Sequence, residues 1–508
     1  MLRTRLNTQE NKTAAPHPAS AGRHATRAGR PRTRPAAWLA AGLAAALAGP
    51  AAAQQTITDA GITNHIDAEF VESDAVDAFK VSVDTDSGNV VLDGTVNNLL
   101  AKRRAEEIAE ATVGVESITN EIMVKASDRN DRAIERDVNR ALAADPAADA
   151  MEVDVEIDDG VAVLAGTVES YAEKRLCETV AAGVDGVTAV TNNIEIVYQV
   201  ERSDSEIRGD VVGRLRNTVT VNSGMLDVDV SGGDVVITGV VGSAAERQNV
   251  YDLAWVPGVE SVDVSGVEID WLADDGAVRS GTDLDVSESG IREAVRNSFR
   301  YSPLVNAYNI NVTVADHTVT LTGTVEDLRA KNAAADLADG IVGVWEVENY
   351  LKVETPAAIS DEALEDDIAA ALTRDAYLNR FEMAITVDNG HAHLYGSVDT
   401  EYEKRRATEV AEAVDGVVSV SNYLEIGATW QSKEDWQIRE DINSELFWSP
   451  FVDSDEITVE VNNGVATLSG TVDDMEERAD ASKNAREGGA RVVDNDLKVE
   501  RGPDSLLP

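Results

Sequence analysis

A short phrase that recurs six times limits the possible folds more than any other feature of the sequence. The phrase joins alternating apolar residues to a glycine and a valine, as in Val91-Leu-Asp-Gly94-Thr-Val96. Successive glycines lie 72, 73, 84, 73 and 74 residues apart, at Gly94, Gly166, Gly239, Gly323, Gly396 and Gly470. This spacing predicts six small modules of one type rather than one large domain.

Each module is predicted to begin with a helix and a β-hairpin. Apolar residues recur at i, i+4 and i+8, as at Ile62, Ile66 and Phe70, which is the pattern of an amphipathic helix. Period-two alternation then predicts a strand. Turn sequences such as Asp388-Asn-Gly390 follow, because Asn and Gly tolerate the positive φ of tight hairpin turns. The second hairpin strand carries the repeated phrase.

A second helix and a third strand are predicted after the hairpin. Preferred N-cap residues lie four positions past each repeated glycine, at Asn98, Ser170, Ser243, Asp327, Thr400 and Asp474. Four of them precede a glutamate by three residues, which predicts capping boxes with Glu173, Glu246, Glu403 and Glu477. Each helix runs to another glycine, expected as its C-cap, and a strand follows, as from Gly186 to Asn192.

The sequence therefore predicts an α+β fold of tandem αββαβ modules. Each module should have a three-stranded mixed sheet with both helices on one face. The expected modules span residues 55–125, 131–198, 203–271, 286–354, 360–427 and 434–500. A linker is expected at 272–285, where the glycine spacing is stretched, and a signal peptide at 1–53.

The αββαβ order, the V-x-L-x-G-x-V phrase and the later G-V-x-x-V-x-N strand resemble the BON domain family. The resemblance covers about residues 55–500. It implies non-enzymatic proteins that bind phospholipid membranes or other hydrophobic ligands, in a family that includes periplasmic proteins induced by osmotic stress. The chain departs from many relatives in having six copies and a very acidic composition.

The first 53 residues have the pattern of an export signal. A basic stretch precedes an apolar run from Ala36 to Gly49, and small residues from Pro50 to Ala53 favour cleavage before Gln54. The apolar run is too short to span a bilayer permanently. The expected location is the periplasm, with secretion beyond the outer membrane left open. Cys177 is the single cysteine, so no intramolecular disulfide can form, and an inert buried thiol is expected.

The charge of the chain limits its partners. There are 44 Lys and Arg against 92 Asp and Glu, a net charge of −48. The first 53 residues hold eight of the basic residues and one acid, so the remainder carries 36 against 91, a net of −55. Such a body repels nucleic acid and bare anionic lipid. A saline habitat and a GC-rich genome would each explain the acidity.

A basic residue lies eight positions after each repeated glycine, and these cations are the candidate ligand-binding residues. They are Lys102, Lys174, Arg247, Lys331, Lys404 and Arg478. One interpretation is contact with phosphates along a membrane. The other is an exposed helix residue that pairs with a glutamate four residues on, such as Glu106 or Glu178. The repeated glycines are interpreted as structural, because such a glycine allows close passage of backbone.

No other residue pattern identifies a catalytic or metal site. His391 and His393 alternate on a strand but lack an evident third ligand. The sequence has no phosphate-binding loop, nucleophile elbow or zinc-protease helix, so no catalytic residue, cofactor or metal is assigned. Trp430, Trp436 and Trp448 gather near the sixth module and favour either a membrane anchor or packing between modules.

Two functional hypotheses follow. The first is a periplasmic protein that associates with phospholipid or envelope surfaces during osmotic or envelope stress. The alternative is a multivalent scaffold that binds protein partners without lipid contact. Equivalent solvent faces on the six modules would favour a shared ligand, whereas divergent faces would favour the scaffold.

Overall fold

The computed structural model describes residues 57–72, 75–145, 147–148, 153–198, 200–271, 286–354, 359–379, 381–426 and 433–499. The expected signal peptide and linker lie outside these residues. From Thr56 onward the chain forms one compact unit. Among the described helices, none combines the length and the apolar character that crossing a membrane requires.

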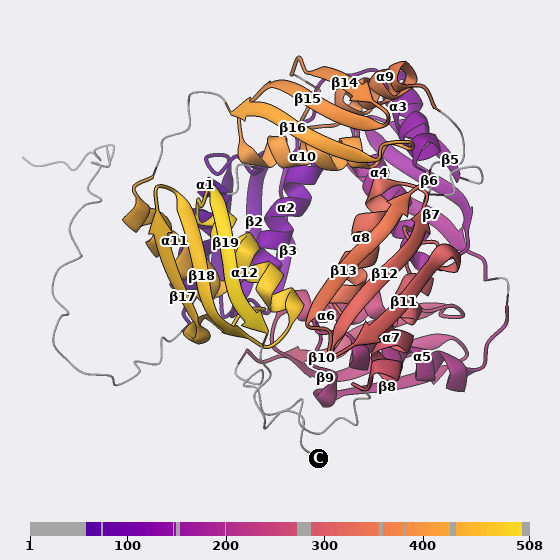
Figure 1. Ribbon diagram of the computed structural model, residues 1–508, viewed down its shortest axis with the longest axis vertical. Coiled ribbons are helices and arrows are strands. Elements are labelled where there is room, and N and C mark those ends of the chain that lie inside the picture. Colours follow the sequence, from indigo (N-terminus) through magenta and orange to yellow (C-terminus); the bar gives the residue numbers. More distant parts are fainter. Residues whose placement is uncertain are drawn as a thin grey trace, which may run out of the picture. The chain divides into compact units, whose positions relative to one another are not determined.

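Six modules repeat the predicted order of helix, strand, strand, helix, strand (Figure 1). Module 1 contains α1 (Asp59–Glu72), β1 (Val81–Asp86), β2 (Asn89–Val96), α2 (Leu99–Glu110), β3 (Ser117–Asn120) and β4 (Met123–Val124). Module 2 contains α3 (Asp131–Ala144), β5 (Val153–Asp158), β6 (Val161–Val168), α4 (Tyr171–Ala182) and β7 (Ala189–Ile196). Module 3 contains α5 (Asp204–Asn217), η2 (Ser223–Met225), β8 (Leu226–Ser231), β9 (Asp234–Val241), α6 (Ala244–Ala254) and β10 (Ser261–Ile269).

The second half of the chain has the same order. Module 4 contains α7 (Glu288–Arg300), η4 (Ala307–Asn309), β11 (Ile310–Ala315), β12 (Thr318–Val325), α8 (Leu328–Asp339) and β13 (Glu346–Val353). Module 5 contains α9 (Asp361–Arg374), β14 (Ala384–Asp388), β15 (His391–Val398), α10 (Glu401–Glu412) and β16 (Ser419–Ile426). Module 6 contains α11 (Asp435–Trp448), η5 (Ser454–Glu456), β17 (Ile457–Asn462), β18 (Val465–Val472), α12 (Met475–Glu487) and β19 (Val492–Val499).

The sheets are mixed, as predicted. In every module the second strand is central, and it pairs antiparallel with the first strand and parallel with the third. In module 1 the third strand is divided into β3 and β4, and both pair with β2. In module 3 the register of β10 against β9 shifts between Asp263 and Gly266. This bulge lies where the asparagine of the other modules is replaced by Val264.

Both helices of a module pack on one face of its sheet, which confirms the predicted layering. In module 4, Ile291 and Val295 of α7 share a core with Ala334 of α8 and with Leu321 of β12. The i, i+4, i+8 residues of all six first helices are buried. These aliphatic contacts supply the main driving force for folding in a chain with 5% aromatic residues.

The predicted N-caps of the second helices all form. Each cap side chain accepts a hydrogen bond from the backbone N–H three residues on. Full capping boxes occur in modules 2 and 5, at Ser170 and Thr400. In module 3 the expected box differs, because Glu246 accepts from the N–H groups of Gly242 and Asn222. Glu477 does the same in module 6, with Asp473 and Asp453. These two glutamates therefore tie the helix to the loop that precedes the first strand.

The glycine expected as C-cap of each second helix lies further along the chain. Helix α4 ends at Ala182 with Gly183 as its cap, and Gly186 lies in the turn before β7. Gly186 has a φ of 95°, and a Cβ there would lie 2.8 Å from Cδ1 of Ile134. The turn needs glycine because it packs directly against the first helix.

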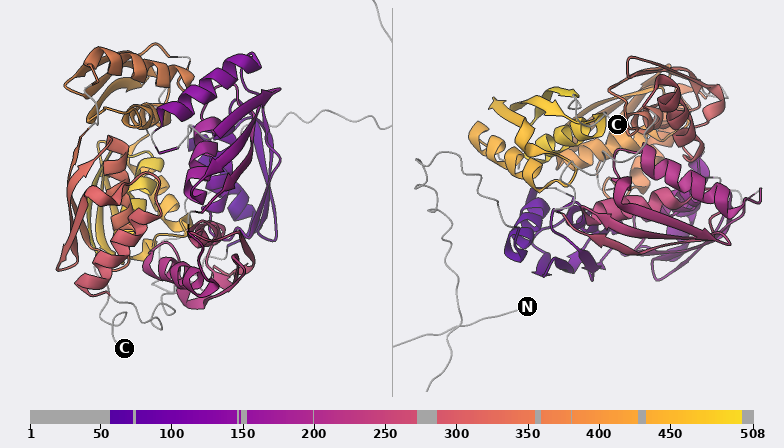
Figure 2. Two further views of the ribbon diagram at one scale, coloured as in Figure 1. Left: turned by 90° about the vertical axis from the view of Figure 1, so that its right-hand side faces the viewer. Right: turned by 90° about the horizontal axis from the view of Figure 1, so that it is seen from below.

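Three pairs of modules are joined by backbone hydrogen bonds at equivalent places. Each bond links the turn after one module's second helix to the end of another module's first helix. Modules 2 and 5 join at Val184 and Asp375, and modules 3 and 4 at Ile341 and Thr218. In modules 1 and 6, Val113 N–H donates to the Trp448 carbonyl (3.1 Å). Figure 2 shows modules 1–3, indigo to magenta, facing modules 4–6 within the compact unit.

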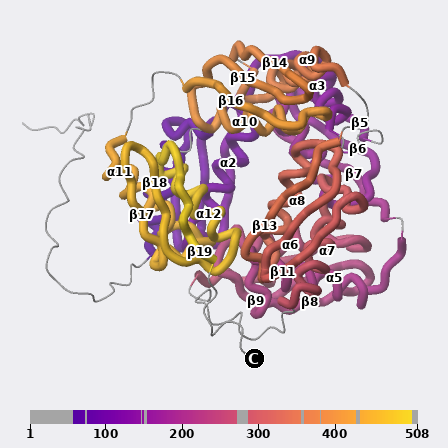
Figure 3. Tube along the Cα trace, in the orientation of Figure 1, coloured from indigo at the N-terminus to yellow at the C-terminus, as the bar shows by residue number. Residues whose placement is uncertain are grey.

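Ion pairs and rings add further contacts between modules. Helices α2 and α12, whose courses can be followed in Figure 3, are joined by Arg104 and Glu487 (2.8 Å). Arg329 of module 4 makes two hydrogen bonds to Asp145 of module 2 (2.6 and 2.8 Å). Tyr171 of module 2 stacks on Trp255 of module 3 with centroids 4.4 Å apart. The modules therefore associate through specific contacts, not through covalent linkage alone.

Candidate functional site

The six recurrent cations are partly buried on the second helices. Lys174 Nζ donates to the Ile194 carbonyl (2.7 Å), and Arg478 donates to the Asn495 carbonyl (3.1 Å), both in the third strand of their own module. Arg247 donates to the Glu116 carbonyl of module 1 (3.2 Å). Within the described part of the chain, none of the six forms an ion pair.

The ion pair expected between these cations and a glutamate four residues on is not found. Glu178 instead pairs with Arg103 of module 1 (2.5 Å). Glu106 accepts from the side chain of Asn120 (3.1 Å). The backbone carbonyls of five of the six cations also accept a hydrogen bond from the recurrent asparagine. In module 2, Asn192 Nδ2 donates to the Lys174 carbonyl (2.9 Å), and modules 1, 4, 5 and 6 share this contact. The recurrent asparagine of the third strand therefore holds the second helix, a role that the sequence pattern alone did not reveal.

The repeated glycines all adopt a φ between 126° and 138°. At Gly323, a Cβ would lie 2.0 Å from the backbone oxygen of Asn309, a residue just before the first strand. At Gly396 the corresponding contact, to the oxygen of Glu382, is 2.9 Å. Backbone passes closely at these positions, so a side chain there would require the strands to shift. Their structural role remains a prediction.

An acidic residue at the start of the first helix recurs with a role that sequence reasoning missed. Asp435 accepts from the N–H groups of Asn463 and Gly464 in the hairpin turn (both 2.8 Å). The equivalent contact occurs at four more positions, Asp59, Asp131, Asp204 and Asp361. The signal was an acid three residues before the first apolar position of each helix set. Part of the acidity is therefore structural.

The outward faces of the sheets in modules 2, 4 and 5 differ in chemistry. Module 2 exposes Asp154 and Glu156 on its first strand. Module 4 exposes Asn311 and Thr313 at the same positions. Module 5 presents the rings of Tyr395 and Tyr423 on its second and third strands. Modules 2, 4 and 5 thus share a fold but not a solvent face, whereas module 3 exposes Asp227 and Asp229 and resembles module 2.

Module 5 carries an exposed aromatic cluster on its outward sheet face. Tyr395 and Tyr423 stack with centroids 5.2 Å apart, and His393 lies 6.0 Å from Tyr423. His391 Nδ1 lies 2.5 Å from the Ser419 hydroxyl. Neither group of candidate metal-ligating side chains in the described residues includes these histidines.

Two further aromatic side chains are almost fully exposed. Phe79 (97% exposed) and Tyr308 (98%) occupy equivalent positions, two residues before the first strands of modules 1 and 4. An exposed aromatic ring on a loop is suited to contact with an apolar surface.

The tryptophans near module 6 differ in their surroundings. Trp448 packs on module 1, where its ring stacks on His65 with centroids 4.9 Å apart. Trp436 is 59% exposed, and Trp430 lies outside the described residues. Cys177 is fully buried as expected, and its thiol donates to the Ala148 carbonyl (3.1 Å).

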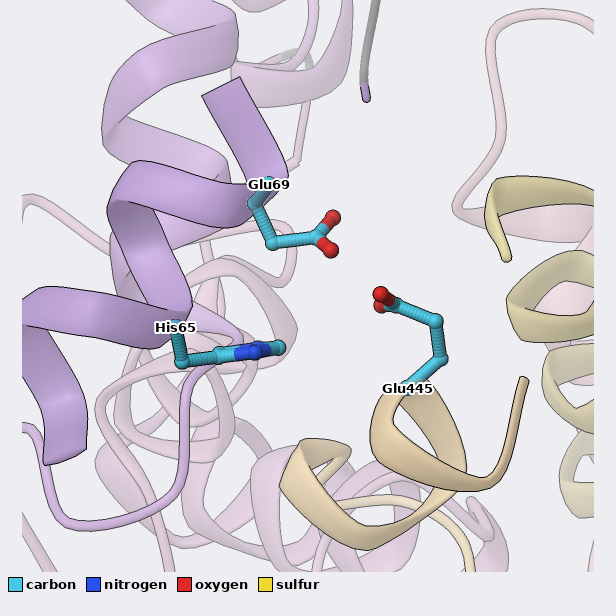
Figure 4. A group of neighbouring side chains, drawn as sticks. All are labelled: His65, Glu69 and Glu445. Carbon is cyan, nitrogen blue, oxygen red and sulfur yellow. The ribbon is translucent and has the colours of Figure 1, made fainter. Parts of the chain in front are cut away.

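A polar cavity of about 220 Å³ lies where modules 1, 3 and 6 meet. His65 and Glu69 of α1 and Glu445 of α11 point toward one another there (Figure 4). Burial lowers the pKa of His65 to about 4, so this imidazole is neutral at physiological pH. Burial and Asp480 together raise the pKa of Glu476, also in the lining, to about 7. This cavity gathers several titratable groups with perturbed pKa values and is a candidate binding site.

Comparison with known proteins relates the repeat to a family. The family model for the BON domain matches six segments, residues 58–126, 130–198, 203–270, 287–355, 360–428 and 434–501. The chain is 31% identical over 144 residues to osmotically-inducible protein Y of Escherichia coli (strain K12), covering 27% of this chain and 72% of that protein. It is 29% identical over 144 residues to outer membrane lipoprotein DolP of Haemophilus influenzae, covering 27% of this chain and 74% of that protein.

Two solved structures show weak similarity. The C-terminal domain of CdsD, a structural protein of the type III secretion system of Chlamydia trachomatis, is 17% identical with a TM-score of 0.12. The matched region covers 41% of this chain and 96% of the CdsD chain. The periplasmic domain of PrgH, a type III secretion inner membrane protein from S. typhimurium, is 13% identical with a TM-score of 0.11. The matched region covers 38% of this chain and 96% of the PrgH chain.

Proposed function

Because the chain belongs to the BON domain family, we propose that it is a non-enzymatic binding protein of the cell envelope that presents several different surfaces to protein partners. The divergence of the outward sheet faces carries this proposal. A shared lipid headgroup would be bound by equivalent residues on each module. The position before the repeated glycine instead holds Ala165 in module 2, Thr322 in module 4 and Tyr395 in module 5. Several weak binding sites on one compact body would together bind a partner more tightly than any single site, because the first contact raises the effective concentration for the next.

The names of the relatives support an envelope location and a role in osmotic stress. One relative is osmotically inducible and another is an outer membrane lipoprotein. We propose that residues 1–53 direct export and that the remainder acts in the periplasm, where six modules with a net charge near −55 stay soluble.

Photo-crosslinking from single outward positions tests the scaffold proposal. A photoreactive residue would replace Glu156, Thr313 or Tyr423, one each on modules 2, 4 and 5. In osmotically stressed cells, each position is expected to crosslink to different proteins, because each face differs in chemistry. Ile134, buried in module 2, is the matched control and should give no partner. Identical products from all three outward positions, or lipid adducts alone, would contradict the proposal.

Association with phospholipid is the second candidate, favoured by Phe79 and Tyr308. Their exposure at equivalent positions before the first strands suits shallow insertion into a headgroup region, and apolar contact would offset repulsion from anionic lipid. Co-sedimentation with zwitterionic and anionic liposomes, across a salt series and with calcium, tests this. Pelleting that is lost in the double variant Phe79→Ser, Tyr308→Ser would support membrane binding. A protein that stays in the supernatant under all conditions eliminates it.

A further inference from the structure

The cavity at modules 1, 3 and 6 brings together side chains that suit a metal ion. One ligand atom from each of His65, Glu69 and Glu445 lies within 4.8 Å of the other two. In a tetrahedral zinc site the ligand atoms lie about 3.3 Å apart, so small rotamer changes would close the set. His65 and Glu69 are four residues apart on α1 and share one face of the helix. Figure 4 shows Glu445 reaching toward them from α11.

The orientation of the imidazole is fixed by packing. The His65 ring stacks on Trp448 with centroids 4.9 Å apart and an interplanar angle of 12°. Trp448 is in turn held at the module interface, because its carbonyl accepts from Val113 N–H. A metal site gains from such support, since a ligand that is already oriented loses little freedom on binding.

The charge of the cavity favours a cation. Its lining holds five carboxylates and two cationic side chains: Glu69, Glu445, Glu476, Asp480 and Glu487 against Arg104 and Lys483. Arg104 is occupied by Glu487 (2.8 Å). A partly buried excess of negative charge is costly, and a divalent ion would reduce that cost.

Asn484 supplies an independent observation. It lines the same cavity at 7% exposure, and its Nδ2 has no hydrogen-bond partner within the described structure. A buried amide in this state has a donor available to a water or an ion in the cavity. It could donate to water on a bound ion or, with the amide turned over, direct its oxygen toward the ion.

We propose that His65, Glu69 and Glu445 bind one divalent first-row transition-metal ion, with zinc as the best match, and that the ion ties module 1 to module 6. The mixed nitrogen and oxygen donor set separates this site from calcium and magnesium sites, which use oxygen ligands. Ligands from helices α1 and α11 would make the ion a cross-link between the two ends of the module array.

Calorimetric titration of the full chain, stripped of metal with a chelator, tests the site. Zinc chloride is expected to bind with one tight site per chain, and an excess of magnesium should not displace it. His65→Phe keeps a ring against Trp448 but removes the ligand nitrogen, and Glu445→Gln keeps the shape of the side chain. Each variant is expected to weaken zinc binding by more than about tenfold.

The matched control is Asp159→Asn. Asp159 belongs to an exposed cluster with Asp131 and Asp158, so it reports on the general attraction of an acidic surface for cations. Asparagine tolerates its φ of 49°, and this variant should bind zinc as the parent does. Circular dichroism would establish that all variants fold. If His65→Phe were unfolded, Glu445→Gln alone would decide the question.

Hydrogen exchange gives a second readout. Zinc should slow amide exchange at Val113, whose N–H bonds module 6, in the parent and in Asp159→Asn but not in Glu445→Gln. Absence of saturable zinc binding would overturn the proposal. So would tight binding that His65→Phe and Glu445→Gln leave unchanged, because the ion would then lie elsewhere.

Discussion

At the scale of single residues, the repeated glycines differ in how much room they leave. A Cβ at Gly323 would meet backbone oxygen at 2.0 Å, whereas one at Gly396 would meet it at 2.9 Å. Gly209, inside α5, has no atom within 4 Å of such a Cβ. Alanine substitutions at these three positions can therefore be compared. The comparison separates the cost of positive φ and of steric contact from the general effect of adding a methyl group on unfolding free energy.

Gly323→Ala is expected to destabilise the protein by about 2–4 kcal/mol, because it combines strained positive φ with a backbone clash. Gly396→Ala should cost less, about 1–2 kcal/mol. The helical control Gly209→Ala should be neutral or stabilising by up to about 1 kcal/mol. Thermal and urea unfolding would measure the differences. Equal losses at Gly323 and Gly396 would show that the close contact is relieved without cost.

The residues of the candidate metal site illustrate what a sequence can and cannot reveal. His65 and Glu69 lie at i and i+4 of a predictable helix, so their shared face was visible. Glu445 comes from a module at the other end of the chain, and no local pattern indicates which modules meet. The site therefore becomes apparent only when the module contacts are known.

At the scale of elements, sequence periodicity predicted the order of α-helices and strands in the modules because every module uses local rules. It did not predict the short helices η2, η4 and η5 or the division of the third strand of module 1 into β3 and β4. The i, i+4, i+8 sets predicted buried helix faces, and N-cap residues predicted where the second helices begin. The predictions failed where one element contacts another. Glu246 contacts the N–H of Asn222 in a distant loop, and Gly186 packs on the first helix rather than capping the second.

The acid that begins each first helix should stabilise the junction of helix and hairpin. Asp435→Ala would remove two hydrogen bonds to the turn and a favourable charge at the helix N-terminus. We expect a loss of about 1–2 kcal/mol in unfolding free energy, measured by urea denaturation.

Glu440→Ala, at an exposed position of the same helix, is the control and should change stability by less than about 0.5 kcal/mol. A similar effect for both variants would mean that the turn contacts add nothing beyond the loss of an acidic side chain.

At the scale of the whole molecule, several buried carboxylates should make stability depend on pH. Burial and neighbouring acids raise the pKa of Glu110 and Glu476 to about 7 and that of Asp339 to about 6. The unfolded chain releases these protons near pH 4 to 4.5, so between there and about pH 7 the folded state binds more protons. Stability must therefore fall as pH rises through this window.

We expect the melting temperature to be a few degrees higher at pH 5.5 than at pH 8, measured by calorimetry at constant ionic strength. His65, whose pKa is lowered to about 4, opposes the trend below pH 6.5, but it is one group against three. Glu476→Gln should reduce the dependence. A melting temperature that rises with pH would contradict the assignment.

The backbone hydrogen bonds pair module 1 with 6, module 2 with 5 and module 3 with 4. Along the chain, each pair therefore encloses the next pair. In a chain that emerges N-terminus first, modules 3 and 4 can associate as soon as both exist, whereas module 1 must wait for the last module. The order of assembly would then run from the middle of the sequence outward, since the shortest loop closes at the smallest entropic cost. A chain that lacks module 6 would leave module 1, the first to be synthesised, without the module to which it is hydrogen-bonded.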